Sequence, residues 1–168
     1  MKKVLVVLLC LGLILVGCRN TETESKVETA QNIDKETFIA NFEALLEPAG
    51  FSLLQHVELD EVSSYSILDE LTDNSTHLSV NYTDTGEITT IIMNEYISAA
   101  SKLNFAVFSL YIYEALELPE VEAQDFYDKY DLFSEDGASA RDEISGWELT
   151  LLDIEYEGEV LRTFSIGK

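Results

Sequence analysis

Residues 98–117 constrain the fold more than any other segment, because they predict a helix that is apolar almost all the way round. The apolar side chains at helical spacing are Ala99, Ala100, Leu103, Phe105, Ala106, Val107, Phe108, Leu110, Tyr111, Ile112, Tyr113, Ala115 and Leu116. A helix of this kind has to be buried on most sides. A membrane span is the competing interpretation, but Lys102, Asn104 and Glu114 leave too short a clean stretch for the roughly 20 residues that a span needs. We therefore expect a core helix that ends before Pro119.

The clearest strand covers residues 77–82, where Leu78, Val80 and Tyr82 alternate with polar side chains. Residues 83–86, Thr-Asp-Thr-Gly, predict a turn in which the glycine takes a positive φ. The apolar residues of 87–94 then predict the partner strand. Residues 76–94 therefore predict a hairpin in a sheet with one solvated face.

The remaining segments give weaker signals of the same two kinds. Apolar side chains on one face predict a helix over 35–47 with Asp34 as its N-cap. The other expected elements are extended chain at 51–59, a short apolar run at 65–71, helical turns at 124–130, an exposed loop at 133–145 and a hairpin formed by 147–155 and 159–166. The order predicts an α+β fold, an antiparallel sheet of about five to six strands with an N-terminal helix and the long buried helix packed on one face.

The first residues form a different kind of pattern. A basic start, Met1-Lys2-Lys3, precedes the apolar run Val4–Val16, and Leu15-Val16-Gly17-Cys18 closes that run. A short apolar core after a basic start is typical of a secretory signal. With the four-residue lipobox 15–18, this leader resembles that of bacterial prolipoproteins. The resemblance implies cleavage after Gly17 and a diacylglyceryl group on the sulfur of Cys18.

The resemblance also implies a location on the extracytoplasmic face of a membrane, to which acyl chains anchor the protein. We expect a signal peptide over 1–17, the lipidated cysteine and a flexible tether over 18–33, and a single α+β domain over 34–168. The tether is polar and spans roughly 20 Å as a random coil. Cys10 and Cys18 are the two cysteines of the chain, so the expected domain has no disulfide and no thiolate site.

The charge excludes one large class of partner. The chain has 32 acidic and 10 basic residues and a formal net charge of −22. Nucleic-acid phosphates repel such a protein, so we exclude nucleic-acid binding. The acidity is compatible with a cationic partner, with divalent ions or with solubility alone.

Short constellations that could support catalysis are poor matches. Asp84-Thr85-Gly86 has the form of an aspartic-protease loop, but those enzymes need two such loops, so a hairpin turn is the better interpretation. His56 and His77, the two histidines, lie in no catalytic motif and predict ordinary strand positions.

Two further groups favour structural roles over binding. Glu135, Asp136, Asp142 and Glu143 are the candidate metal ligands, here for calcium, although their spacing does not match an EF-hand and a solvated acidic loop is the better explanation. Tyr111, Tyr113, Tyr127 and Tyr130 predict an aromatic cluster around the long helix.

The favoured hypothesis is a non-catalytic, membrane-anchored binding module without a cofactor, for a protein, a peptide or a component of the cell envelope or wall. The alternatives are an envelope enzyme without a motif, built around His77, Asp84 or the acidic loop, a calcium-dependent module, and an inhibitor or immunity-type lipoprotein.

Overall fold

The computed structural model describes residues 32–69, 75–98, 101–133, 139–156 and 158–168. The expected leader, lipobox and most of the tether, including Cys18, lie outside the described residues. The elements in chain order are helix α2 (Lys35–Leu46), the 3-10 turn η1 (Glu47–Ala49), strands β1 (Phe51–Leu59), β2 (Val62–Asp69), β3 (Ser75–Tyr82) and β4 (Ile88–Tyr96), helices α3 (Ser101–Ala115) and α4 (Ala123–Lys129), and strands β5 (Ser139–Ile144), β6 (Trp147–Tyr156) and β7 (Glu159–Gly167).

Within the described residues, the strands form one seven-stranded sheet in the order β1-β2-β3-β4-β7-β6-β5. Every neighbouring pair is antiparallel. The predicted α+β class is confirmed, but the predicted number of strands, five to six, is wrong. The strand that the prediction missed, β5, lies inside the segment 133–145 that we expected to be a loop. Polar and charged side chains dominate β5 because it is an edge strand, where such residues prevent pairing with other chains.

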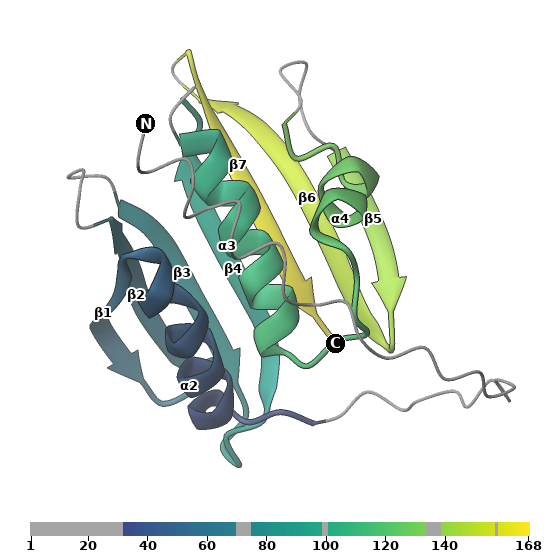
Figure 1. Cartoon of the computed structure of the whole chain (residues 1–168). Helices are drawn as coiled ribbons and strands as arrows, with labels where there is room; N and C mark the ends of the chain where they lie inside the picture. The colour runs from purple at the N-terminus through teal and green to yellow at the C-terminus, as the bar shows by residue number, and fades with distance from the viewer. Residues whose placement is uncertain (1–31, 70–74, 99–100, 134–138, 157) are drawn as a thin grey trace, which may run out of the picture.

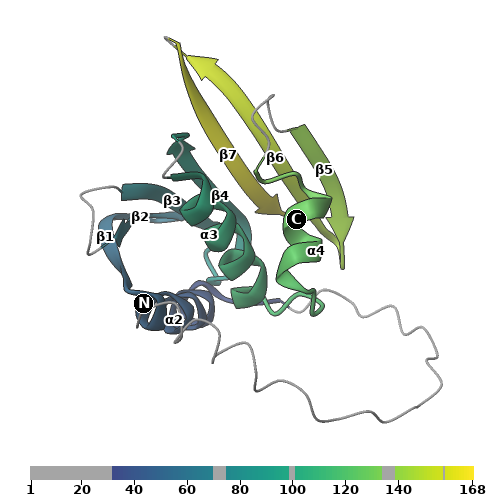
Figure 2. The same cartoon turned by 45° about the horizontal axis from the view of Figure 1, so that its top comes forward.

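The helices cover one face of the sheet. In Figure 1, α2, α3 and α4 all lie in front of the strands. Figure 2 shows the same one-sided arrangement and the twist that turns β5–β7 away from β1–β3. The predicted hairpins over 76–94 and 147–166 are both present, and Gly86 has the predicted positive φ of 85°.

The core fills the space between the helices and the sheet. On α3, nine residues are buried, among them Phe105, Phe108 and Ile112, as the apolar pattern predicts. On α2, Phe38 and Phe42 are fully buried and their rings stack with centroids 5.6 Å apart. Asp34 caps α2 as predicted, because its carboxylate accepts a hydrogen bond of 2.8 Å from the N–H of Thr37. Among the described residues no helix is both long and apolar enough to cross a bilayer.

The core depends on Phe42, which is completely buried on α2. We expect Phe42→Ala to lower the free energy of unfolding by about 3–5 kcal/mol, because it removes a buried ring and leaves a cavity. Urea unfolding measures the change. The exposed neighbour Glu43 provides the control, since Glu43→Ala is expected to change stability by no more than about 0.5 kcal/mol. Equal effects of the two substitutions would contradict this packing.

Candidate functional site

The face of the sheet that the helices leave open is the candidate binding surface, and we call it the outer face. Residues paired across neighbouring antiparallel strands share a face, so the strand register assigns each side chain to one face of the sheet. On the central strands β2, β3, β4 and β7 the outer-face residues are Val62, Ser64, Ser66, Leu68, His77, Ser79, Asn81, Thr90, Ile92, Asn94, Tyr96, Leu161, Thr163, Ser165 and Gly167. None of these residues is an aspartate, glutamate, lysine or arginine. The same face carries Glu159 at the end of β7, Glu148 on β6, and Arg141 and Glu143 on β5. The centre of the outer face is therefore neutral in a strongly acidic chain, and its charged groups lie toward the β5 edge.

Much of the exposed apolar surface also lies on this face. Among the described residues, the large apolar side chains of highest exposure are Leu54, Val57, Leu59, Tyr96, Leu103, Phe133, Leu152, Ile154 and Val160. Six of these nine belong to outer-face positions of β1, β4 and β6. Tyr96, Leu161 and Ile154 are direct cross-strand neighbours, and we call them the apolar row. Contiguous exposed apolar groups are typical of interaction sites.

Acidic residues lie around the neutral centre, at the turn end of the sheet and on the edge strands β5 and β6. Asp60 and Glu61 form the β1–β2 turn, and Asp84 lies in the β3–β4 turn. All three side chains are exposed. The interfaces of protein complexes likewise have a centre poor in charged residues and a polar rim. The outer face has this composition.

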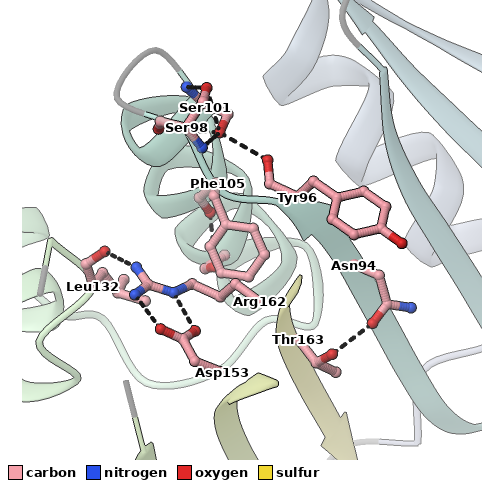
Figure 3. Close-up of polar contacts among 10 residues, drawn as sticks. Asn94, Tyr96, Ser98, Ser101, Phe105, Leu132, Asp153, Arg162 and Thr163 are labelled. Atoms are coloured by element: carbon pink, nitrogen blue, oxygen red, sulfur yellow. Dashed lines mark hydrogen bonds and ion pairs between the residues drawn. The ribbon is translucent and has the colours of Figure 1, made fainter. Parts of the chain in front are cut away.

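Hydrogen bonds hold some outer-face side chains in place. The hydroxyl of Thr163 donates to the side-chain oxygen of Asn94 over 2.7 Å, and Figure 3 shows this contact between β7 and β4. Thr90 faces Gly167 across the same strand pair. A Cβ at Gly167 would lie 2.9 Å from the hydroxyl oxygen of Thr90, so glycine makes room for that side chain.

The two histidines flank one serine. His56 Nε2 lies 2.7 Å from the hydroxyl oxygen of Ser66, and His77 is the cross-strand neighbour of Ser66 on β3. A catalytic serine needs an accessible hydroxyl and a base that a third group orients. Ser66 is only 3% exposed, and the outer-face positions of β2, β3 and β4, which surround it, contain no carboxylate. The pair therefore favours a structural hydrogen bond, and both histidines occupy strand positions as predicted.

The opposite, helix-covered face contains a buried charge pair. Arg162 on β7 is 1% exposed, and its Nε and Nη2 atoms each donate to the carboxylate of Asp153 on β6 over 2.7 Å. A third donor, Nη1, lies 2.6 Å from the carbonyl oxygen of Leu132. Figure 3 shows the guanidinium between these two acceptors. Because the pair is bidentate and its remaining donor is satisfied, it tolerates burial.

Glu95 on β4 is the cross-strand neighbour of Arg162. Its carboxylate accepts a hydrogen bond of 2.8 Å from the hydroxyl of Thr76. Burial raises the pKa of Glu95 from 4.5 to about 7, against the opposing effect of hydrogen bonds from Thr76 and Ser101. Asp153 already compensates the positive charge of Arg162. The ion pair as a whole is therefore nearly neutral and does little to favour the ionised form of Glu95. Glu95 is therefore a buried acid that titrates near neutral pH.

Glu95 lies beside the joint between β4 and α3. The hydroxyl of Ser101, the first residue of α3, donates to the carbonyl oxygen of Tyr96 over 3.2 Å and accepts from the N–H of Ser98 over 2.7 Å. Figure 3 shows Ser98, Ser101 and Tyr96 linked in this way. The position of α3 on the sheet therefore depends on the end of β4.

A cavity of about 420 Å³ opens at the turn end of the sheet, next to the start of α2. It is lined by Asp34, Lys35, Glu36, Asp60, Tyr82, Thr83, Asp84, Thr85 and Gly86. Lys35 forms an ion pair of 2.5 Å with Glu58 and lies 4.6 Å from the centroid of the Tyr82 ring. Lys35 thus supplies the positive charge that this acidic and aromatic lining favours. Asp84-Thr85-Gly86 forms the predicted hairpin turn, in which the N–H of Gly86 donates to the carbonyl oxygen of Thr83 over 2.9 Å.

The candidate calcium ligands do not converge where they are described. Asp142 accepts a hydrogen bond of 2.8 Å from the hydroxyl of Tyr130 and pairs with Lys129 at 2.5 Å. Its hydrogen bond with Lys129, followed by that with Tyr130, lowers the pKa of Asp142. Glu143 follows Asp142 on β5 and so faces the other side of the sheet. Glu135 and Asp136 lie outside the described residues, and within the described part no group of three His, Cys, Asp or Glu residues could hold a metal ion.

The predicted tyrosine cluster forms around Phe126 of α4. The rings of Tyr113, Tyr127 and Tyr130 lie with centroids 5.2, 6.2 and 4.9 Å from that of Phe126. Tyr113 and Tyr130 are buried. The tyrosines therefore fix α4 against α3 rather than line a binding groove.

Sequence reasoning missed the buried row formed by Glu95, Arg162 and Asp153. A signal for it exists in the alternation, because Arg162 has the same parity as the buried Phe164 and Ile166. Asp153 likewise has the parity of the buried Leu151. Charged residues at inward positions of paired strands indicate a buried ion pair, but only once the strand order is known.

Comparisons with known proteins identify no relative. No protein-family model, curated protein or solved structure matches the chain. The functional argument therefore rests on the residues and their geometry.

The raised pKa of Glu95 predicts a pH dependence of stability. Between pH 4.5 and about 7 the folded protein holds a proton that the unfolded chain has lost. Stability from this group is therefore present below pH 4.5 and is lost as the pH rises to about 7, by at most about 1.4 kcal/mol per pH unit. Wild type should lose free energy of unfolding between pH 5 and pH 8, whereas Glu95→Gln should not lose this contribution. The variant should therefore be more stable, compared with wild type, at pH 8 than at pH 5, as measured by urea unfolding.

A matched control is the exposed Glu43 on α2. Glu43→Gln should leave the difference between pH 5 and pH 8 as it is in wild type. A Glu95→Gln variant with the wild-type pH dependence would contradict the buried, titrating state of Glu95.

Proposed function

We propose that the chain is a lipid-anchored extracytoplasmic lipoprotein whose folded part is a non-catalytic protein-docking module, with the outer face as its docking surface. The observation that carries the docking proposal is the neutral centre of the outer face. A formal net charge of −22 belongs to the chain, yet the outer-face positions of β2, β3 and β4 contain no acidic or basic residue, and β7 adds Glu159 at its end alone. Covering this centre buries no carboxylate and therefore avoids the cost of desolvating charge.

The surface also offers contacts that suit a protein partner. Exposed apolar side chains such as Tyr96 and Ile154, 53% and 46% exposed, can lose contact with water on binding. Between them and the turn end, hydroxyl and amide groups such as Ser79 and Asn94 can form hydrogen bonds. A tyrosine among neutral hydrogen-bonding groups is typical of protein interfaces.

The proposed extracytoplasmic location rests on the leader. A basic start, a 13-residue apolar core over 4–16 and the sequence Leu-Val-Gly-Cys at 15–18 support export and lipidation. One acyl chain gives only marginal membrane binding, whereas two give a stable anchor. Diacylglycerol on Cys18 would supply two such chains.

The competing enzyme hypothesis has one supporting observation, the contact between His56 and Ser66. A hydrolase built on it would need substrate to reach Ser66, which is buried. A non-catalytic module therefore agrees better with the geometry.

Intact-mass measurement of the chain extracted from membranes tests the proposed export and lipidation. We expect the mass of residues 18–168 plus diacylglycerol, because cleavage follows lipidation of Cys18. Cys18→Ser should abolish both the processing and the lipid mass. Cys10→Ser, which changes the other cysteine of the leader, should leave both unchanged. An unprocessed thiol-bearing chain in the soluble fraction would contradict the proposal.

Site-specific photo-cross-linking in the native envelope tests the docking surface. A photoreactive residue in place of Ser79, on the outer face of β3, should give a discrete cross-linked protein product. The same residue in place of Leu103, which is 59% exposed on α3, should not give that product. Equal products at both positions, or none at position 79, would remove the outer face as a docking surface.

A further inference from the structure

We propose that the free edge of strand β1 binds an extended segment of a partner protein, which adds to the sheet as a further strand. The proposal goes beyond the docking suggested for the outer face, because it concerns main-chain contacts at one edge of the sheet. It follows from the difference between the two edges, the exposed side chains of β1 and the charge around them.

The two edges of the sheet are protected to different degrees. Within the described residues the sheet begins with β1 and ends with β5, and Figure 1 shows them as its outermost strands. Natural edge strands avoid further pairing through short length, charged side chains or proline. β5 has six residues, of which Arg141, Asp142 and Glu143 are charged. β1 has nine residues, with no lysine, arginine or proline and a single carboxylate, Glu58. The β1 edge is therefore the less protected one.

The main chain of β1 offers hydrogen bonds along this edge. In the described part of the chain, β1 pairs with β2 on one side and with no strand on the other. Alternate residues of β1 therefore direct their N–H and C=O groups away from the sheet. An extended polypeptide matches such a row of donors and acceptors, as in other complexes in which a peptide adds a strand to a sheet. The chemistry of the edge thus selects an extended segment as its ligand.

A bulge at His56 limits where this pairing can occur. The register of β1 with β2 shifts between Gln55 and Val57, and a bulge disrupts the ladder locally. The regular part, Phe51–Gln55, still has the length of a short strand, since strands contain about 3–10 residues. We therefore place the main-chain pairing at Phe51–Gln55.

Exposed apolar side chains extend the surface beyond the bulge. Leu54, Val57 and Leu59 are 47, 47 and 64% exposed, and their cross-strand neighbours place all three on the outer face. From Gln55 to Leu59 every residue of β1 is exposed, so both faces of the sheet are open beside this part of the edge. A partner strand with apolar side chains at alternate positions would remove this apolar surface from water.

The charge around β1 selects a basic partner. Residues 32–69, which form α2, η1, β1 and β2, contain one basic residue, Lys35, and it already forms an ion pair. The acidic residues of this range are Asp34, Glu36, Glu43, Glu47, Glu58, Asp60, Glu61 and Asp69. Glu47 precedes β1, Asp60 and Glu61 follow it, and all three are exposed. A segment with basic residues at its ends is attracted to this edge, whereas a second copy of the acidic chain is repelled.

The test uses the full mature lipoprotein in a neutral detergent and the synthetic peptide Lys-Val-Thr-Val-Thr-Val-Thr-Lys as the probe. The peptide has basic ends, and valine alternates with threonine between them. We expect saturable binding that slows amide hydrogen exchange in β1 and leaves exchange in β5 unchanged, because new hydrogen bonds protect the amides that face the peptide. Failure of the probe to bind, or equal protection of the two edge strands, would overturn the inference.

N-methylation of the probe separates edge pairing from contacts made by side chains alone. Neighbouring residues of a strand direct their N–H groups to opposite edges. Methylating the three valine nitrogens should therefore affect one edge of the peptide, and methylating the three threonine nitrogens the other. We expect one of these peptides to lose binding and the other to retain it. Retention of binding by both would contradict main-chain pairing.

A lysine on β1 tests the position of the site. Leu54→Lys should weaken binding of the probe at least about tenfold, because it removes an apolar contact and repels the basic peptide. Leu152→Lys is the matched control, since Leu152 is 42% exposed on the outer face of β6. It makes the same change of charge and should leave the dissociation constant within about twofold of wild type. Equal effects of the two substitutions would overturn binding at the β1 edge.

The photo-cross-link at position 79 separates this inference from the proposed function, because that position reports on the outer face. A discrete product at position 79 without protection of β1 by the probe would retain the docking surface and overturn the edge proposal. Protection of β1 with no product at position 79 would support the edge proposal and remove the outer face as a docking surface.

Discussion

The constraint that shapes the structure is that its helices cover one face of the sheet and leave the other face uncovered. Within the described residues, α2, α3 and α4 all lie on one face of the sheet. The apolar residues of the inner face pack against them and form the core. The outer face remains in contact with water, and its hydroxyl and amide groups suit that environment. A one-sided sheet of this size leaves a broad surface that has no role in the core. That surface is where we place the function.

The core itself contains a polar row at one end. Arg162 and Asp153 form a buried bidentate pair, and Glu95 lies next to them in register. Such a row stabilises the fold less than apolar packing of the same volume would, because desolvating the charges opposes their attraction. Its geometry instead fixes neighbouring segments. Arg162 binds the carbonyl oxygen of Leu132, which precedes β5, and the residue after Glu95, Tyr96, accepts a hydrogen bond from Ser101 at the start of α3. The row therefore links β4, β6 and β7 to two connections that cross the inner face.

The sequence predicted much of the fold because the two periodicities are clear. The buried helix α3, the hairpin of β3 and β4 and the cap at Asp34 all follow from local patterns. The edge strand β5 was missed because its polar residues resemble those of a loop, and its pairing with β6 is a tertiary interaction. The sequence predicted a sheet with one solvated face, but the contact of His56 with Ser66 and the composition of that face across the strands could not be predicted, because they depend on strand order and register. The proposed location outside the cell rests on the leader alone.

Chemical labelling of single cysteines in spheroplasts tests the central claim, that the outer face lies outside the cytoplasm and is covered in the native envelope. The expected mature chain has no cysteine besides the lipidated Cys18, so Asn94→Cys and Leu103→Cys each introduce one reporter thiol. A membrane-impermeant maleimide should label the cysteine at position 103 rapidly and the one at position 94 slowly. In the unfolded protein both should react at similar rates. Rapid labelling at both positions in spheroplasts would show that nothing covers the outer face. Labelling at neither position until the membrane is broken would contradict the extracytoplasmic location.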